Sequence, residues 1–422
     1  MQKLIVKGKK KIIGNIKISG SKNATLPILA ASLLSNKIIK IKNIPIVKDV
    51  ITMTELLRFM GSNIKLNKKT KSIFINNKNK KLKMVAPYSF VKTMRAGVIV
   101  LGSLLAKYGK AKVSLPGGCA IGTRPIDVHL FGLKKLGAKI KIRNGYIFAD
   151  AKKGLIGNKI RFPSISVGAT ENVIIAASFA RGTTYLKNCA CEPEIKDLTN
   201  FLKKMGIKIS WLGKRHIKIN GNKKKLNQVA HSVMFDRIEA GTFIIAGALV
   251  SSKLRITGLD TKVLNHELKI LKKMGVKFST KRKEIIVLES KNLKPVNIKT
   301  QPYPGFPTDL QAQIMVLMSK ANGTSKIKEN IFENRFMHVP ELNRMGAKIK
   351  ILGNTAFIYG PQNLNGAEVM ATDLRASVSL VLAGLIAENE TFVNRVYHLD
   401  RGYEKLENKL RNCRASIFRI KK

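Results

Sequence analysis

Residues 202–210 read "LKKMGIKIS" and residues 271–279 read "LKKMGVKFS", with the leucine, the apolar residue and the glycine in the same places. Three further copies of this pattern occur along the chain: "LLRFMGSNIK" (56–65), "LKKLGAKIK" (133–141) and "LNRMGAKIK" (342–350). A sixth copy, "LRNCRASIF" (410–418), has Cys413 and Arg414 in place of the apolar residue and the glycine. Self-similarity at a nearly fixed spacing is typical of a modular architecture.

Each copy of the pattern predicts a helix that ends in a glycine turn and is followed by a strand. In the copy around Gly206, one helix face carries four apolar side chains at helical spacing: Ile195, Leu198, Leu202 and Met205. Gly206 is placed to cap the C-terminus of this helix, and "IKIS" (207–210) then alternates as a strand does. A second, more apolar helix and a strand lie upstream, as in "IIAASFARGTTYLKN" (174–188). The repeating unit is therefore predicted to be a βαβαββ-like module.

The spacing of the copies divides the chain into six modules. The glycines fall at positions 61, 137, 206, 275 and 346, with Arg414 in the sixth place, so the intervals are 76, 69, 69, 71 and 68 residues. Modules of this size must bury their helices against their neighbours. A chain of 422 residues is also too long for one ordinary core. We therefore expect an α/β protein with two domains of three modules each.

The longest interval contains the glycine-rich stretch "LPGGCAIGTRPID" (115–127). Its glycines indicate a loop, and an insertion in a repeat usually carries function because packing does not require it. A thiol on such a loop close to a cation, here Cys119 near Arg124, can be a reactive group. The alternative is that Cys119 is a small apolar filler. The position of the loop in an insertion favours the reactive role.

The net charge of +53 and the pI near 10.4 are unusual for a globular protein and are typical of one that binds nucleic acid. However, the lysines are spread along the whole chain, and aromatic residues make up only 6% of it, without a basic-aromatic stacking pattern. We therefore interpret the excess charge as solvated faces that favour anionic substrates, and we expect no specific nucleic-acid partner.

The composition also bears on metals and on location. The four cysteines show no paired C-x-x-C spacing and the six histidines do not cluster, so the sequence predicts neither a metal site nor a disulfide framework. The longest apolar runs, such as "SLVLAGLIA" (379–387), are too short to span a membrane. The first residues alternate like a strand and lack the apolar block of a signal peptide. We expect a cytoplasmic protein without membrane insertion.

The chain resembles the enolpyruvyl transferases from end to end. Nine motifs carry the resemblance in this order: "GSKNATLPIL" (20–29), "VKTMRAG" (91–97), "LPGGCAIGTRPID" (115–127), "SVGATEN" (166–172), "DRIEAGTF" (236–243), "FPTDLQAQ" (306–313), "ENRFMHVPEL" (333–342), "ATDLRAS" (371–377) and "HLDRGYE" (398–404). The resemblance implies a two-domain inside-out α/β barrel of six βαβαββ-like modules, three per domain. Residues 22–233 would be inserted into a domain made of residues 1–21 and 234–422, with the active site in the interdomain cleft.

The resemblance also implies a reaction. The enolpyruvyl group of phosphoenolpyruvate would be transferred to the 3′-hydroxyl of UDP-N-acetylglucosamine with release of phosphate, the first committed step of peptidoglycan synthesis, without a cofactor. The sister branch of the family, which uses shikimate 3-phosphate, lacks both "GGCAIGTRP" (117–125) and "SVGATEN" (166–172). Transfer to shikimate 3-phosphate is one alternative, and a basic nucleic-acid-binding protein is an alternative from another class.

Family roles can be carried over to two reacting groups. Cys119 matches the acid that protonates the methylene carbon of phosphoenolpyruvate, a thiol that also bonds covalently to substrate and is the target of the epoxide fosfomycin. Asp309 matches the general base that takes the proton of the sugar hydroxyl. From the sequence alone, Asp309 reads equally well as the N-cap of the helix "LQAQIMVLM" (310–318).

The remaining matched residues bind the substrates. Lys22, Arg124 and Arg401 match the contacts to phosphoenolpyruvate, with Arg375 a lesser candidate, and Asp373 matches a carboxylate beside the reacting centre. The matched contacts to the nucleotide sugar are Asn23, Arg95, Arg124, Pro125, Ile126, Asp127, Val128, Ser166, Val167, Gly168 and Ile331. Ser164 stands where the family commonly has lysine, which puts one nucleotide contact in doubt.

Overall fold

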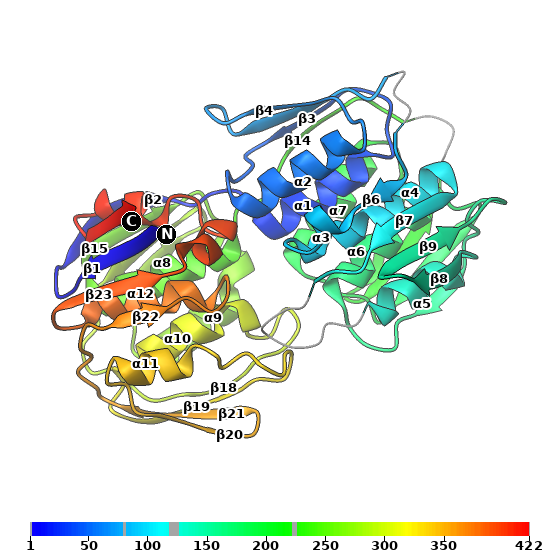
Figure 1. Cartoon of the computed structure of the whole chain (residues 1–422). Coiled ribbons are helices and arrows are strands. Elements are labelled where there is room, and N and C mark those ends of the chain that lie inside the picture. Colours follow the sequence, from blue (N-terminus) through cyan, green and yellow to red (C-terminus); the bar gives the residue numbers. More distant parts are fainter. Residues whose placement is uncertain (1, 79–81, 118–125, 222–225, 422) are drawn as a thin grey trace. The chain divides into compact units, whose positions relative to one another are not determined.

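The computed structural model of the chain describes residues 2–78, 82–117, 126–221 and 226–421 (Figure 1). The described residues form two compact units. The first unit contains residues 2–19 and 235–421, and the second contains the described residues between 20 and 234. Each unit has its own hydrophobic core.

The module around Gly206 shows how the repeat folds. Its elements in chain order are β10 (Lys159–Arg161), α6 (Val167–Ala177), β11 (Thr183–Lys187), α7 (Pro193–Lys204), β12 (Lys208–Gly213) and β13 (His216–Asn220). The sheet order is β10-β11-β13-β12, in which β10 and β11 are parallel and the other pairs are antiparallel. This is the βαβαββ arrangement predicted from the sequence.

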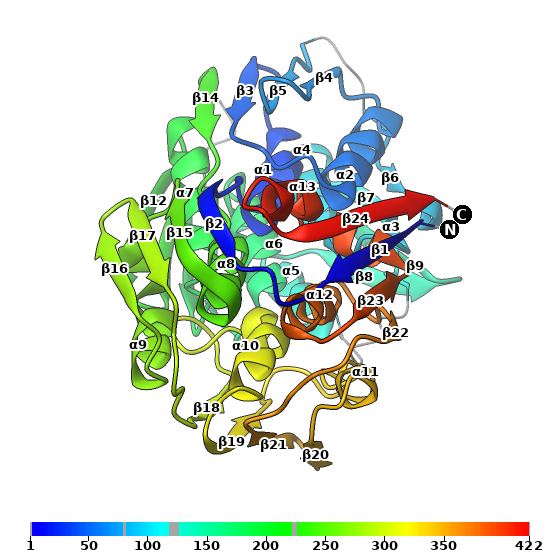
Figure 2. The same cartoon turned by 90° about the vertical axis from the view of Figure 1, so that its left-hand side faces the viewer.

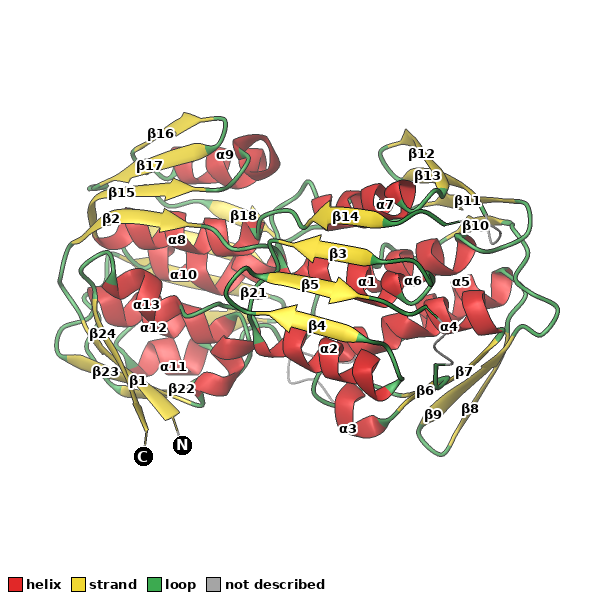
Figure 3. Cartoon of the chain, turned by 90° about the horizontal axis from the view of Figure 1, so that it is seen from above, coloured by secondary structure: helices red, strands yellow, loops and turns green. Residues whose placement is uncertain are grey.

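The other two modules of the second unit follow the same plan. One comprises β6 (Val85–Ala86), α3 (Tyr88–Val91), η1 (Arg95–Ile99), α4 (Val100–Tyr108), β7 (Lys110–Ser114), α5 (Asp127–Lys135), β8 (Lys139–Arg143) and β9 (Tyr146–Asp150). The other comprises α1 (Lys22–Ser32), β3 (Ile39–Lys42), α2 (Lys48–Phe59), β4 (Ile64–Asn67) and β5 (Ser72–Ile75). The sheet of this last module is completed by β14 (Val229–Ser232), which runs parallel to β3 (Figure 3). In the sequence, β14 follows the other two modules of the unit.

The first unit contains the remaining three modules. The first comprises α8 (Arg237–Val250), β15 (Ser251–Thr257), η2 (Thr261–Leu264), α9 (Asn265–Lys273), β16 (Phe278–Lys281) and β17 (Glu284–Leu288). The second comprises β18 (Asn297–Lys299), η3 (Thr308–Leu310), α10 (Gln311–Met318), β19 (Gly323–Lys328), α11 (Val339–Arg344), β20 (Ile349–Leu352) and β21 (Thr355–Gly360). The third comprises β22 (Glu368–Met370), α12 (Ala376–Ile386), β23 (Glu390–Asn394), η4 (Val396–Arg401), α13 (Leu406–Arg411) and β24 (Ser416–Lys421).

The N-terminal segment completes two sheets of the first unit. Strand β1 (Gln2–Lys7) lies between β23 and β24 and is antiparallel to both (Figure 2). Strand β2 (Ile12–Lys17) runs parallel to β15. Both ends of the described chain are therefore held in the same unit.

One apolar helix of each module lies inside its unit, and the four-stranded sheets lie outside (Figures 1 and 3). These inner helices are α1, α4, α6, α8, α10 and α12. In α10 all eight residues are buried, and in α12 only Ile386 is not. Helices that are apolar all round are stable only when they are buried on every side. Among the described residues, no helix has both the length and the apolar character needed to cross a bilayer. The predicted inside-out α/β fold with six repeated modules is confirmed.

The turn that the sequence repeat encodes ends one outer helix of each module: α2, α5, α7, α9, α11 and α13. In α7, Gly206 N–H donates to Lys203 O at 2.9 Å and Ile207 N–H donates to Leu202 O at 3.1 Å, with φ of 100° at Gly206. This is a Schellman cap. The same pair of bonds with a positive φ recurs at Gly61, Gly137, Gly275, Gly346 and Arg414. The apolar residue before each turn is fully buried: Met60, Leu136, Met205, Met274, Met345 and Cys413.

Arg414 keeps this turn without a glycine, at a φ of 69°. A left-handed conformation costs a residue with a Cβ roughly 1–2 kcal/mol, and the extra freedom of glycine in the unfolded chain offsets part of that. Arg414→Gly should therefore raise the free energy of unfolding by up to about 1 kcal/mol, measured by urea denaturation. As the matched control, Gly206→Ala should lower it. A less stable Arg414→Gly variant would show that contacts of the arginine side chain outweigh the backbone strain.

Candidate active site

Asp309 lies in η3, directly before the buried helix α10, and its carboxylate is held by two arginines. Arg335 Nη2 donates to Asp309 Oδ1 at 3.1 Å, and Arg375 Nε donates to Asp309 Oδ2 at 3.3 Å. The arginine side chains are 4% and 2% exposed, whereas that of Asp309 is 27% exposed. The carboxylate is thus accessible from outside, while the charges that stabilise its ionised form lie underneath.

Asp309 is not a helix N-cap in the structure. The N-cap position of α10 is occupied by Leu310, which makes no side-chain capping bond. The N-cap of η3 is Pro307, which makes none either. Asp309 instead makes charge-assisted hydrogen bonds to two side chains from distant parts of the sequence.

Arg375, the lesser candidate for a phosphoenolpyruvate contact, lies buried beside Asp309. Burial lowers the pKa of its guanidinium, but Tyr403, Asp309 and Asp236 more than offset this, so the pKa is raised overall. The side chain therefore stays charged beneath Asp309. Its backbone N–H donates to Asp373 Oδ1 at 2.6 Å, and so does that of Ala376 at 3.0 Å. Asp373 thereby organises the start of α12.

Arg401 is the last residue of η4 and is partly buried. Gly402 follows it, and a Cβ at Gly402 would lie 2.3 Å from Leu374 Cδ1, so any larger residue here would require the Leu374 side chain to shift. The motif "HLDRGYE" (398–404) is thus packed directly against "ATDLRAS" (371–377). Burial lowers the pKa of His398, and nearby Arg401 lowers it further.

A buried glutamate arranges the loop that carries Ile331. Glu329 is 3% exposed. Its Oε1 accepts from Thr300 Oγ1 at 2.8 Å, from Ile331 N at 2.8 Å and from Phe332 N at 3.2 Å. Its Oε2 accepts from Thr308 Oγ1 at 2.9 Å. Because Thr308 precedes Asp309, one carboxylate positions both the proposed sugar contact and the residue beside the proposed base.

Sequence reasoning missed two of these residues, Arg335 and Glu329. Arg335 stands inside the quoted motif "ENRFMHVPEL" (333–342), which offered a signal. The same motif contains His338, which is fully buried. Burial lowers the pKa of His338 to about 4, and Arg335 also lowers it, although Asp373 acts in the opposite direction. His338 is therefore neutral at physiological pH.

The second unit presents its candidate residues on different elements. Lys22 and Asn23 begin the buried helix α1, whose N-cap Ser21 accepts from Ala24 N at 3.3 Å. Lys22 is 7% exposed, and its Nζ lies 3.1 Å from Asp49 Oδ2 of α2. The ammonium group is thus held in place by a carboxylate. Asn23 is partly exposed.

The amino end of α6 carries the predicted turn at 166–168. Ser166 caps the helix by accepting from Ala169 N at 3.3 Å, while Ser164 and Val167 are exposed. A Cβ at Gly168 would lie 3.0 Å from His129 Cε1, so the His129 ring of α5 packs against this turn. Asn172 Nδ2 lies 3.2 Å from His129 Nδ1. Burial lowers the pKa of His129 to about 3, with Arg95 of η1 acting in the same direction.

The other expected contacts of this unit are only partly visible. Ile126 is buried, Asp127 is exposed in the first turn of α5, and Val128 is partly exposed. Cys119, Arg124 and Pro125 lie outside the described residues.

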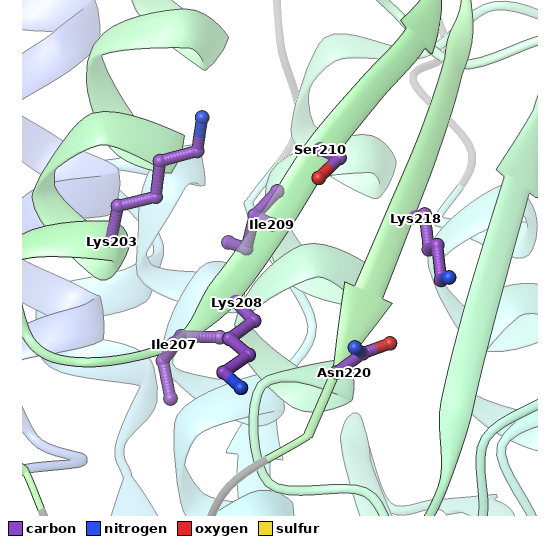
Figure 4. Close-up of a pocket in the computed structure, with 7 residues that line it drawn as sticks. All are labelled: Lys203, Ile207, Lys208, Ile209, Ser210, Lys218 and Asn220. Atoms are coloured by element: carbon purple, nitrogen blue, oxygen red, sulfur yellow. The ribbon is translucent and has the colours of Figure 1, made fainter.

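A pocket of about 460 Å³ lies elsewhere, on β12 and β13. Figure 4 shows its lining residues, which include none of the candidate residues: Lys203, Ile207, Lys208, Ile209, Ser210, Lys218 and Asn220. Within the described ranges, no group of three or more His, Cys, Asp or Glu side chains is arranged to hold a metal ion.

Most of the described candidate residues share one kind of place, at or next to the amino end of an inner helix. Lys22 and Asn23 belong to α1, Ser166 to α6, Asp309 to α10, and Asp373 and Arg375 to α12. Helix amino ends carry a partial positive charge and free backbone N–H groups, which favour anions. The arrangement therefore suits substrates that carry carboxylate or phosphate groups.

Comparison with known proteins identifies the class. The sequence model of the EPSP synthase (3-phosphoshikimate 1-carboxyvinyltransferase) family matches residues 6–410, and the chain belongs to this family of enolpyruvyl transferases. The resemblance found in the sequence motifs is thereby confirmed.

Two full-length relatives share one enzyme name, which is more specific than the name of the family. The chain is 61% identical over 420 residues to the UDP-N-acetylglucosamine 1-carboxyvinyltransferase of Pelagibacter ubique (strain HTCC1062), and the alignment covers 100% of both chains. It is 52% identical over 428 residues to the enzyme of the same name from Thermodesulfovibrio yellowstonii, again with 100% of both covered.

Solved structures support the fold. The enolpyruvyl transferase NikO from Streptomyces tendae aligns with a TM-score of 0.91 at 24% identity, covering 99% of this chain and 98% of that one. EPSP synthase from Acinetobacter baumannii aligns with a TM-score of 0.75 at 16% identity, and both chains are fully covered.

Proposed function

We propose that the protein transfers the enolpyruvyl group of phosphoenolpyruvate to the 3′-hydroxyl of UDP-N-acetylglucosamine and releases phosphate, the first committed step of peptidoglycan synthesis. The observation that carries the proposal is the identity of 61% over the full length with a relative named for this reaction. Both substrates are anions, which agrees with the charge of the chain and with the helix amino ends. We place the reaction in the cytoplasm, as expected from the sequence.

The proposed chemistry has two stages. In the addition, Cys119 donates a proton to the methylene carbon of phosphoenolpyruvate while the sugar oxygen bonds to the neighbouring carbon, and Asp309 takes the hydroxyl proton. In the elimination, the new methyl group returns a proton to the Cys119 thiolate, the carbon–carbon double bond forms again, and the bond from carbon to the phosphate oxygen breaks. The hydroxyl proton taken by Asp309 leaves with the released phosphate. The two buried guanidiniums beside Asp309 support its role, because a general base must be ionised to accept a proton.

The remaining candidate residues would bind the two substrates. Lys22, Arg124 and Arg401 would hold the phosphate and carboxylate of phosphoenolpyruvate, with Asp373 beside the reacting carbon. The residues at 126–128 and 166–168, with Asn23, Arg95 and Ile331, would hold the nucleotide sugar. Ser164 cannot supply the charge of the lysine common at its position, so one contact would be weaker. The division into two domains that share one active site remains part of this proposal.

The alternatives have less support. The family model and a structure that is 16% identical carry the name of the enzyme that uses shikimate 3-phosphate. The relatives at 61% and 52% identity carry the name of the enzyme that uses the nucleotide sugar. A nucleic-acid-binding protein would account for the charge but not for this identity.

The role of Asp309 can be tested by Asp309→Asn, with phosphate release from phosphoenolpyruvate as the assay. Turnover should fall by roughly 10²–10⁴-fold, the usual contribution of a positioned base, while UDP-N-acetylglucosamine still binds. Removing this charge takes one anionic partner away from the buried Arg335 and Arg375 and should lower stability, so folding must be confirmed by circular dichroism. Near-normal turnover in the folded variant would exclude Asp309 as the base.

The role of Cys119 can be tested with fosfomycin. A soft nucleophile beside an anion site is open to alkylation by this epoxide, so we expect time-dependent inactivation that UDP-N-acetylglucosamine accelerates. Cys119→Asp should stay active, because aspartate can still donate a proton, and it should be insensitive to fosfomycin. Mass spectrometry should locate the adduct on Cys119. A label on Cys189, Cys191 or Cys413, or a sensitive Cys119→Asp variant, would contradict this role.

A further inference from the structure

Tyr403 lies in the last of the sequence motifs, and the proposed chemistry does not use it. It is 2% exposed, so it is almost entirely closed to solvent and to substrate in this structure. Its hydroxyl lies 2.9 Å from Thr242 Oγ1 on α8, and Gln313 Nε2 on α10 donates to it at 3.1 Å. A buried hydroxyl with two side-chain partners from two different helices is an arrangement that fixes positions.

The direction of these hydrogen bonds follows from counting protons. Thr242 Oγ1 donates its single proton to Ile238 O at 2.8 Å. The Tyr403 hydroxyl must therefore donate to Thr242, which leaves its oxygen free to accept from Gln313. Each proton in this series of hydrogen bonds has one acceptor. Donation therefore runs in one direction, from Gln313 to Tyr403, from Tyr403 to Thr242, and from Thr242 to Ile238.

The same Gln313 amide reaches Asp309. Gln313 Nε2 donates to Asp309 O at 2.9 Å, and a longer contact of 3.3 Å joins it to Thr242 Oγ1. An amide nitrogen has two protons, and the two shorter bonds use both. The Tyr403 hydroxyl thus holds the amide that holds the main chain of Asp309.

The ring of Tyr403 supports the other side of Asp309. The guanidinium carbon of Arg375 lies 5.2 Å from the centroid of this ring, within the range of a cation–π contact. Arg375 Nε in turn donates to the Asp309 carboxylate. One buried tyrosine therefore fixes Asp309 twice, through Gln313 at the main chain and through Arg375 at the carboxylate.

We propose that Tyr403 is a positioning residue for the general base: without contacting substrate, it sets the place of the Asp309 carboxylate through Gln313 and Arg375. This inference rests on the proposed function, since it assigns Asp309 its part in that reaction. A positioned base loses efficiency steeply when it shifts, because proton transfer requires hydrogen-bond distance to the substrate hydroxyl.

The test separates the hydroxyl from the ring. Tyr403→Phe keeps the ring under Arg375 and removes the hydroxyl, with its bonds to Gln313 and Thr242 and its interaction with the Arg375 guanidinium. The kcat for phosphate release should fall roughly 10-fold, the scale of effect expected from a small misplacement. The KM for each substrate should stay unchanged, because no substrate contact is lost. Tyr108→Phe is the matched control, since it removes a phenol hydroxyl from α4 in the other unit, and its kcat should equal that of the unsubstituted enzyme.

A second variant tests the route. Gln313→Leu removes the amide that joins Tyr403 to Asp309, and its kcat should fall by a similar factor. Since both groups act through one series of hydrogen bonds, the double variant should be no slower than the slower single variant. If Tyr403→Phe does not fold, a reduced kcat in Gln313→Leu at unchanged KM supports the same route, and a normal kcat in that variant overturns it.

The outcomes separate the two proposals. If the unsubstituted enzyme releases no phosphate with UDP-N-acetylglucosamine, the proposed function fails. If it is active but Tyr403→Phe keeps a normal kcat, or raises KM alone, the positioning role fails. Multiplicative losses in the double variant would likewise show that Tyr403 does not act through Gln313.

Discussion

The packing of three apolar helices at the centre of each unit is the constraint on which the rest of the structure depends. Helices such as α10, buried along their whole length, have no polar face to give to water. Every sheet must therefore lie outside them, and each module can only be stable next to its neighbours. The polar ends of these helices remain the places where functional groups can reach a substrate. This explains why Lys22, Ser166, Asp309 and Asp373 all stand at or next to an amino end.

Much of this could be predicted from the sequence because the controlling signals are local. A glycine after a helix of fixed periodicity predicts a cap, and Gly206 forms one. The sixth copy departs from the pattern, yet Arg414 adopts the same turn with the same two hydrogen bonds, next to the buried Cys413. The resemblance grouped residues 1–21 with residues 234–422, but the sequence did not predict which strands β1, β2 and β14 would pair with, because those partners lie far away in the sequence.

The candidate site shows the same limit. Asp309 could be proposed from its motif, but its contacts with Arg335 and Arg375 could not, nor could the contact of Arg375 with Tyr403. These residues come from three other segments, and only folding brings them together. Each of them is one basic or aromatic residue among many, so composition gives no signal. Their burial is what makes them effective, because a guanidinium out of water acts on a carboxylate far more strongly than an exposed one does. The proposed base is thus held by buried side chains from other segments of the chain.

The central claim is that this site transfers an enolpyruvyl group to a nucleotide sugar. Phosphorus NMR of the enzyme with phosphoenolpyruvate and one acceptor at a time tests it most directly. The account predicts inorganic phosphate and an enolpyruvyl nucleotide sugar in equal amounts with UDP-N-acetylglucosamine, and no phosphate with shikimate 3-phosphate or without an acceptor. Phosphate release with shikimate 3-phosphate and none with UDP-N-acetylglucosamine would contradict it.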